Sequence, residues 1–249
     1  MKRIIPILLI KDRLLYKTIN FKNATYIGDP FIALKIFNEK EVDELIVLDI
    51  NNQNKEPDFE FLNDLASEAF MPLSYGGGIS NIDYAEKIFR IGFEKVVLNT
   101  ANYSNFDLLS LISGRFGSQA VICAIDYKIS LFKKRSCVFM NSSKSINKNI
   151  IQFINEAVEA GAGEILLQCV NFEGTMEKMD ISFIKTIVDK VNVPVIGTGG
   201  SPSHKYIKEF FDSTNASALA AGSIFVYHGP LKGVLINYPS YDLKEELIP

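Results

Sequence analysis

The chain has 249 residues, of which 47% are hydrophobic and 22% are charged, and its formal net charge is −3 at pH 7. This composition supports a large buried core, and the length suits one (β/α)8 domain as well as two small domains. The basic residues are scattered along the chain, which argues against a nucleic-acid partner.

The first apolar run, residues 3–10, predicts a buried strand. Charged residues flank it on both sides and no small-residue cleavage site follows, so the run does not fit a signal peptide. It is also too short to span a membrane. We therefore expect a cytoplasmic protein with no membrane partner.

Seven further short apolar runs follow, separated by amphipathic stretches of helical length. They cover residues 44–50, 72–75, 95–99, 120–126, 164–170, 193–198 and 217–222. This alternation is typical of repeated βα units with parallel strands. We predict one domain over residues 1–249, a closed (β/α)8 TIM barrel rather than an open sheet. The irregular segment Tyr127–Asn149 predicts a hairpin over the barrel mouth.

Two glycine-rich patches, residues 75–80 (YGGGIS) and 197–202 (GTGGSP), lie about half the chain apart. Each is followed by a second small, polar strand end, and this repetition predicts two homologous half-barrels. Glycines let backbone N–H groups approach an anion closely, so we predict two phosphate sites for one ligand phosphorylated at both ends. The alternative is that these glycines only make tight turns. The first predicted site comprises Gly77, Gly78, Asn99 and Thr100, and the second comprises Gly199, Gly200, Gly222 and Ser223.

Helix starts are expected directly after both glycine patches. Ser80 or Asn81 is predicted to cap the helix after the first patch. Ser201, which precedes Pro202, is predicted to cap the helix after the second.

Asp126 ends the run 120–126 and is the best candidate for general acid–base chemistry, although an aspartate at a strand end can also hold a loop. We expect Asp49 and Glu173 to orient substrate hydroxyls or loop backbone. Lys17 is a candidate phosphate ligand. Cys123 has the opposite strand parity to Asp126, so it should face the helices.

The histidines and cysteines predict neither a metal site nor a bound cofactor. His204 and His228 have no neighbouring histidine, cysteine or acidic motif, which argues against a zinc site or a Ser-His-Asp triad. The three cysteines form no C-x-x-C pair, and their odd number argues against a disulfide framework.

Four charged residues each open a different predicted strand: Arg3, Glu44, Lys95 and Glu164. If their side chains face the lumen, the amino-terminal end of the barrel carries a ring of two positive and two negative charges. Such a ring would form a gate that a small neutral molecule can pass. The alternative is coincidence, because strand starts are often polar.

Short strings in a specific order along nearly the whole chain resemble the HisF family, the cyclase subunit of imidazole glycerol phosphate synthase. They are KRIIP, INF, GDP, DEL, LDI, YGGGI, KVVLNTA, FGSQAV, AID, AGAGEILL, EGT, GTGG and AAGS. The resemblance implies a (β/α)8 barrel that binds a bisphosphorylated ribonucleotide at the carboxyl ends of its strands. It also implies a HisH-like glutaminase subunit on the opposite face, which sends ammonia through the barrel.

Carried over residue by residue, the resemblance assigns the family's two phosphate sites to the two glycine sets above. It assigns the family's acid–base aspartate on the fifth strand to Asp126. It assigns the ammonia gate to the charged ring of Arg3, Glu44, Lys95 and Glu164.

Three departures from the family pattern affect the predicted activity. The first strand of the family reads IIPCLDVKDGR, and the corresponding segment here reads IIPILLIKDRL. Leu9 therefore stands where the family has its second catalytic aspartate. The family's D-R-D-G-T is Asn171–Thr175, and its glycine-rich turn near Asn141–Lys144 reads NSSK. The pattern resembles HisF-like paralogues found with lipopolysaccharide and flagellar glycan genes. In these, the barrel and its glutaminase are thought to supply ammonia to a separate sugar amidotransferase.

Three functional interpretations remain open at this point. The first is an ammonia-conducting subunit that serves the amidination of a nucleotide sugar. The second is a working cyclase of histidine biosynthesis with an acid–base pair reorganised around Asp12 or Glu173. The third is a structural partner that stabilises a glutaminase and conducts nothing. Leu9 favours the first over the second, and the charged ring favours the first over the third.

Overall fold

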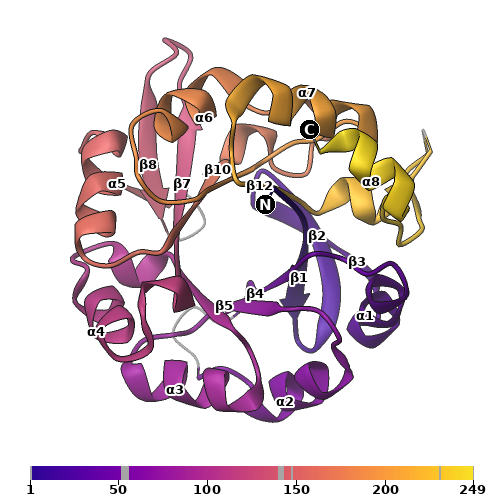
Figure 1. The fold of residues 1–249 in the computed structure, drawn as a ribbon, viewed down its shortest axis with the longest axis horizontal. Helices are drawn as coiled ribbons and strands as arrows, with labels where there is room; N and C mark the ends of the chain where they lie inside the picture. Colours follow the sequence, from indigo (N-terminus) through magenta and orange to yellow (C-terminus); the bar gives the residue numbers. More distant parts are fainter. Residues whose placement is uncertain (1, 52–55, 140–142, 147, 230, 249) are drawn as a thin grey trace.

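Eight parallel strands close into a barrel in the computed structural model, which describes residues 2–51, 56–139, 143–146, 148–229 and 231–248 (Figure 1). Strand β1 pairs with β12 and β4, and β7 pairs with β10, which closes the ring. The predicted TIM barrel is confirmed, while the homology of its two halves stays a prediction. The barrel strands are β1 (Arg3–Lys11), β4 (Leu45–Asp49), β5 (Leu73–Gly76), β6 (Lys95–Leu98), β7 (Val121–Ile129), β10 (Glu164–Cys169), β11 (Val195–Thr198) and β12 (Ala218–Ala221).

Helices surround the barrel on its outside (Figure 1). None of those in the described residues is long and apolar enough to cross a membrane. They are α1 (Pro30–Glu39), α2 (Phe59–Glu68), α3 (Ile82–Ile91), α4 (Asp107–Phe116), α5 (Ile150–Glu159), α6 (Ile181–Val188), α7 (His204–Thr214) and α8 (Tyr241–Leu247). Short 3-10 helices cover Thr100–Asn102, Ser118–Ala120, Val170–Phe172 and Ser223–Phe225.

Of the two predicted helix caps, one is confirmed and one is wrong. Asn81 caps α3, since its side chain accepts a 2.9 Å hydrogen bond from the Tyr84 backbone N–H. The prediction for Ser201 is wrong, because the chain continues for two more residues before α7 begins. Ser203 is the cap there, and its side chain accepts from the Tyr206 backbone N–H.

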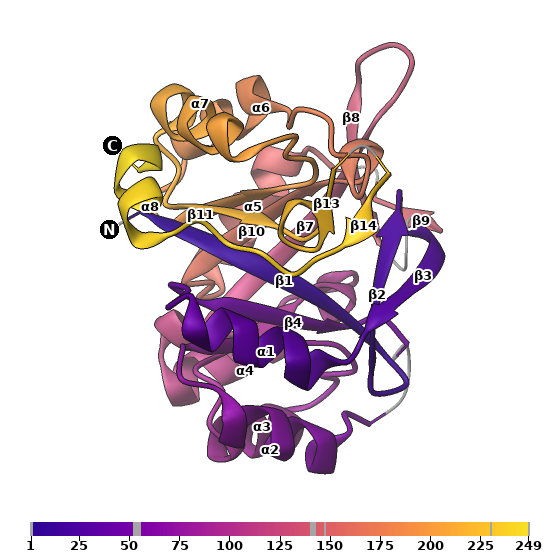
Figure 2. The ribbon, with the colours of Figure 1, turned by 90° about the vertical axis from the view of Figure 1, so that its right-hand side faces the viewer.

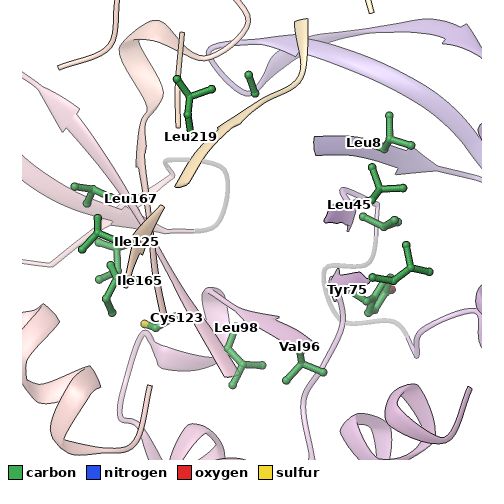
Figure 3. Packing of buried hydrophobic residues seen from close by; sticks show 14 of the residues in the cluster. Leu8, Leu45, Tyr75, Val96, Leu98, Cys123, Ile125, Ile165, Leu167 and Leu219 are labelled. Atoms are coloured by element: carbon green, nitrogen blue, oxygen red, sulfur yellow. The ribbon is translucent and has the colours of Figure 1, made fainter. Parts of the chain in front are cut away.

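The core has two layers because strand residues alternate between the helix side and the lumen. The outer layer, between strands and helices, includes Leu8, Leu98 and Cys123 (Figure 3). Cys123 is fully buried there, as predicted, and all three cysteines are free. The inner layer fills the lumen and consists of Ile5, Ile7, Leu9, Ile46, Val97, Ile122, Ala124, Leu166, Ile196, Ala218 and Ala220.

Hairpins rise from the carboxyl ends of the barrel strands, on the side opposite the chain's amino terminus (Figure 2). The predicted hairpin after residue 126 is confirmed, since β7 continues to Ile129 and pairs antiparallel with β8. A second hairpin of β2 and β3 was not predicted. The additional strands are β2 (Leu14–Ile19), β3 (Lys22–Gly28), β8 (Arg135–Phe139), β9 (Lys144–Ser145), β13 (Tyr227–His228) and β14 (Gly233–Val234).

Candidate functional site

A cavity of about 480 Å³ opens at the carboxyl ends of the barrel strands. All residues predicted for catalysis or for ligand binding line it, and Leu9 lines it as well. The predicted set is Lys17, Asp49, Gly77, Gly78, Asn99, Thr100, Asp126, Glu173, Gly199, Gly200, Gly222 and Ser223. The structure thus brings together residues from across the chain, and their individual roles remain predictions.

The first glycine turn depends on the absence of side chains. Gly77 and Gly78 have φ values of +133° and +66°, which disfavour other residues. A Cβ atom on Gly77 would lie 2.7 Å from the carbonyl oxygen of Asp49. Asp49 itself accepts a 3.0 Å hydrogen bond from the Asn51 backbone N–H. Asp49 therefore supports the loop after β4, which was one of the two roles expected for it.

The second glycine turn is equally crowded. Gly199 and Gly200 have φ values of +93° and +96°. A Cβ atom would lie 2.6 Å from the carbonyl oxygen of Cys169 at the first position, and 2.4 Å from that of Glu177 at the second. The glycines thus permit close backbone approaches, and they leave the cavity side of the turn without side chains.

Lys17 reaches Gly222, in the second predicted phosphate site, from the hairpin of β2 and β3. Its side chain is buried, and a Cβ atom on Gly222 would lie 1.9 Å from its Nζ atom. Burial lowers the pKa of Lys17, and the negative charge of Glu173 opposes that shift. A buried ammonium group is costly unless it is paired, so a bound anion here would be strongly favoured.

Glu173 fixes the hairpin in place. Its Oε1 atom accepts a 2.7 Å hydrogen bond from Thr18 Oγ1, and its Oε2 atom accepts a 2.8 Å bond from the Phe21 backbone N–H. The pairing of β2 with β3 is irregular between Lys17 and Ile19, and both Lys17 and Thr18 are buried. Glu173 thus orients loop backbone, and Lys17, at the irregular part of the pairing, lines the cavity.

Asp126 and Leu9 both line the cavity, one with an ionisable side chain and the other with an apolar one. Burial raises the pKa of Asp126 to about 7, against the effect of a 3.1 Å hydrogen bond from Asn99 Nδ2 and with a smaller contribution from the charge of Glu173. A carboxyl group with such a pKa suits proton transfer near neutral pH. Leu9 is 8% exposed and belongs to the inner apolar layer, against which Leu48 packs.

The charged ring forms at the other end of the barrel. Arg3 contacts Glu44 at 2.5 Å and Glu164 at 2.6 Å, while Lys95 contacts Glu164 at 2.7 Å and Glu44 at 3.0 Å. The charges alternate around the axis, and Ser74 Oγ donates a further hydrogen bond to Glu44 at 2.7 Å. Burial opposes ionisation of Glu164, but Arg3 and Lys95 hold its pKa below the usual value. The ring is therefore closed by ion pairs on all four sides.

The structure gives Ser201 and Asn171 environments that the sequence did not predict. Ser201 is buried against the cavity, and its Oγ atom has no hydrogen-bond partner in the described part of the chain. Asn171 exchanges two hydrogen bonds with the backbone of Ile129 and so braces the hairpin of β7 and β8. The predicted turn near 141–144 lies partly outside the described residues, since Asn141 and Ser142 are not among them.

Comparisons of the sequence with known proteins identify its family. The family model for "Histidine biosynthesis protein" matches residues 3–232. A Pseudomonas aeruginosa protein named "Putative imidazole glycerol phosphate synthase subunit hisF2" is 43% identical over 96% of both chains. A Leptospira borgpetersenii protein with a similar HisF name is 42% identical over 99% of this chain and 98% of its own length. The Streptococcus sanguinis "Imidazole glycerol phosphate synthase subunit HisF" is 36% identical over 91% of this chain and 90% of its own.

The chain belongs to the HisF group of the histidine biosynthesis protein family. Within this HisF barrel, the cavity and the charged ring lie at opposite ends of the lumen, with the inner apolar layer between them. Among the described residues of this HisF chain, no group of three histidine, cysteine or acidic side chains is placed to hold a metal ion.

Proposed function

We propose that this HisF-type barrel pairs with a HisH-like glutaminase in a cytoplasmic heterodimer and conducts ammonia to an acceptor reaction. The acceptor reaction that we propose is the amidination of a nucleotide sugar by a separate sugar amidotransferase. One observation supports this proposal: Leu9, which stands where the resemblance places the family's second catalytic aspartate, lines the same cavity as Asp126 with an apolar side chain, while the charged ring is complete.

The route that we propose for ammonia follows the barrel axis. It starts at the ring of Arg3, Glu44, Lys95 and Glu164, which screens the entrance, and continues through the inner apolar layer. Apolar walls suit neutral ammonia and disfavour ammonium, because a charged group pays a large desolvation cost there. Opening the ring requires that at least one ion pair separate, and docking of the glutaminase at this face would provide the trigger.

The competing function is a working cyclase, which needs a second acid–base group. Glu173 is a poor substitute, because both of its carboxylate oxygens accept hydrogen bonds from the β2–β3 hairpin. Asp12 is exposed, does not line the cavity, and accepts a hydrogen bond from Asn51 Nδ2 at 2.8 Å. Asp126 would therefore have to perform the proton transfers alone, and this disfavours the cyclase.

The phosphate sites remain part of the proposal. The glycine turns, Lys17 and Ser223 together suit a small ligand with phosphate groups, and we propose that such a ligand occupies the cavity.

The test is an isotope competition. The barrel, its glutaminase and the sugar amidotransferase of the same organism are incubated with amide-labelled ¹⁵N-glutamine and an excess of unlabelled ammonium. Channelled nitrogen keeps its label, so mass spectrometry of the nucleotide sugar should show mostly ¹⁵N. A product with the isotope ratio of the free ammonium pool would refute conduction. Formation of imidazole glycerol phosphate from the bisphosphorylated intermediate would favour the cyclase instead.

A further inference from the structure

Exposed hydrophobic side chains are concentrated on three hairpins at the carboxyl end of the barrel (Figure 2). Of the twelve large hydrophobic residues exposed in the described part of the chain, eight belong to the segments 14–28, 127–139 and 227–235. They are Leu14, Ile19, Tyr26, Leu131, Phe132, Leu231, Val234 and Leu235. Single exposed apolar residues are normal on protein surfaces, but their concentration on one face indicates an interaction site.

The β7–β8 hairpin carries two apolar side chains that are almost fully exposed. Leu131 is 100% exposed and Phe132 is 94% exposed at its tip. The base is held firmly, because Arg135 pairs with Asp180 at 2.7 Å and stacks over the ring of Phe183. A braced hairpin that presents two adjacent apolar side chains to water is well suited to insertion into a partner.

The same three segments carry positive charge only. They contain seven lysine or arginine residues and no aspartate or glutamate, although the whole chain has a net charge of −3. Lys22, Lys133, Lys134 and Lys232 are exposed, and none of them makes an ion pair in the described residues. These three hairpins, here called the rim, are therefore both apolar and basic.

The three hairpins stand on one side of the barrel. β2, β3, β8, β13 and β14 all lie away from the chain's amino terminus (Figure 2). Lys22 from β3 lines the cavity, and Asp126 lies at the base of the β7–β8 hairpin. A partner that contacts all three hairpins would therefore cover the cavity mouth, at the opposite end from the charged ring.

We propose that this rim docks a protein partner whose own surface has an apolar depression edged by acidic side chains. The inference rests on the proposed function, since the partner that fits this place is the enzyme that consumes the ammonia. Its active site would then face the cavity directly, and the reactive nitrogen would pass between proteins without reaching bulk water. An anionic lipid surface has related chemistry, but it would seal the mouth and repel a phosphorylated ligand.

The experiment measures binding of the intact barrel–glutaminase complex to the sugar amidotransferase by biolayer interferometry. Replacing the hairpin tip with L131S/F132S should weaken binding about tenfold or more, because buried apolar anchors dominate interface energetics. The charge variant K133E/K134E should slow association and reduce its dependence on salt. The control I32S/L111S changes two similarly exposed apolar residues on α1 and α4 and should have no effect.

The outcomes separate this inference from the proposed function. If the tip variant binds as tightly as the unaltered complex, the docking surface is elsewhere, even where ¹⁵N transfer still occurs. If the unaltered complex instead sediments with phosphatidylglycerol vesicles and the tip variant does not, the rim is a membrane-binding surface and the inference is wrong. Weaker binding by the tip variant, together with normal glutaminase activity and no vesicle binding, supports it.

Discussion

The ammonium group of Lys17 lies in the space that a side chain at Gly222 would need, 1.9 Å from where the Cβ atom of such a side chain would lie. These residues are far apart in the chain, and the hairpin of β2 and β3 brings them together. The contact places a buried lysine beside Gly222 in the second predicted phosphate site, whereas the nearest atoms to a Cβ at Gly77 in the first site belong to Asp49. We therefore expect the second site to hold phosphate more tightly than the first.

Gly222→Ala should displace Lys17 without disrupting the fold. The φ of Gly222 is −110°, which alanine readily adopts, and the nearest obstacle is the flexible end of a side chain. Stability should change by no more than about 1 kcal/mol. The affinity for inorganic phosphate, measured by calorimetry, should fall about tenfold, because a charge-assisted contact is lost. Gly114→Ala, on α4 with open space around it, is the control and should leave affinity unchanged.

Asp126 should make the protein less stable as the pH rises. Its pKa is 3.8 without burial and about 7 in the folded protein, so the folded state holds the proton more tightly than the unfolded state. Its stabilising contribution is complete at low pH, declines as the pH rises from about 4 to about 7, and is constant above that. In urea unfolding, the unfolding free energy of the unaltered chain should fall relative to that of Asp126→Asn over this range, because asparagine does not ionise. A difference that does not vary with pH would show that Asp126 is ionised throughout.

The lumenal face of the barrel was predictable because it depends on strand parity alone. Alternation placed Asp126 toward the cavity and Cys123 toward the helices, and both placements are confirmed. Parity also placed Arg3 and Lys95 at the axis, where both now contact Glu44. Where strands are short, parallel and buried, local periodicity is enough to determine which side chains meet.

The loops were less predictable because their geometry depends on long-range contacts. The β2–β3 turn uses Asn20 and Phe21, both with positive φ, and phenylalanine gives no turn signal. Its conformation is held by Glu173, which is distant in the chain. Similarly, serine is a favoured residue at helix N-caps, which is why Ser201 was expected to cap α7. The helix begins two residues later than expected, and Ser203 is its cap.

Lys95→Met should uncouple the two reactions of the complex. The variant leaves the carboxylates of Glu44 and Glu164 with Arg3 as their one remaining cation in the ring, so a cost of about 3 kcal/mol in stability is expected. Glutamine hydrolysis should continue while the nitrogen delivered per glutamine falls. Lys244→Met, which breaks a 2.7 Å ion pair with Asp43 outside the ring, is the matched control. If both variants deliver nitrogen normally, ammonia does not pass the ring.

Leu9 is the residue on which the choice of function depends. A positioned acid–base group contributes on the order of 10²–10⁴-fold to a reaction rate, and leucine can neither accept nor donate a proton. With free ammonium and the bisphosphorylated intermediate, we expect no measurable cyclase activity. Leu9→Asp should restore at most a trace, because the segment Asn171–Thr175 also departs from the family pattern.

The most direct test of this account is genetic complementation of a bacterial strain that lacks its histidine cyclase. The gene for the unaltered chain, expressed together with its glutaminase, should not support growth without histidine, while an authentic HisF gene in the same vector should. An immunoblot for the expressed chain establishes that it is present. Growth without histidine supported by the unaltered chain would contradict the ammonia-delivery account and identify the protein as a cyclase.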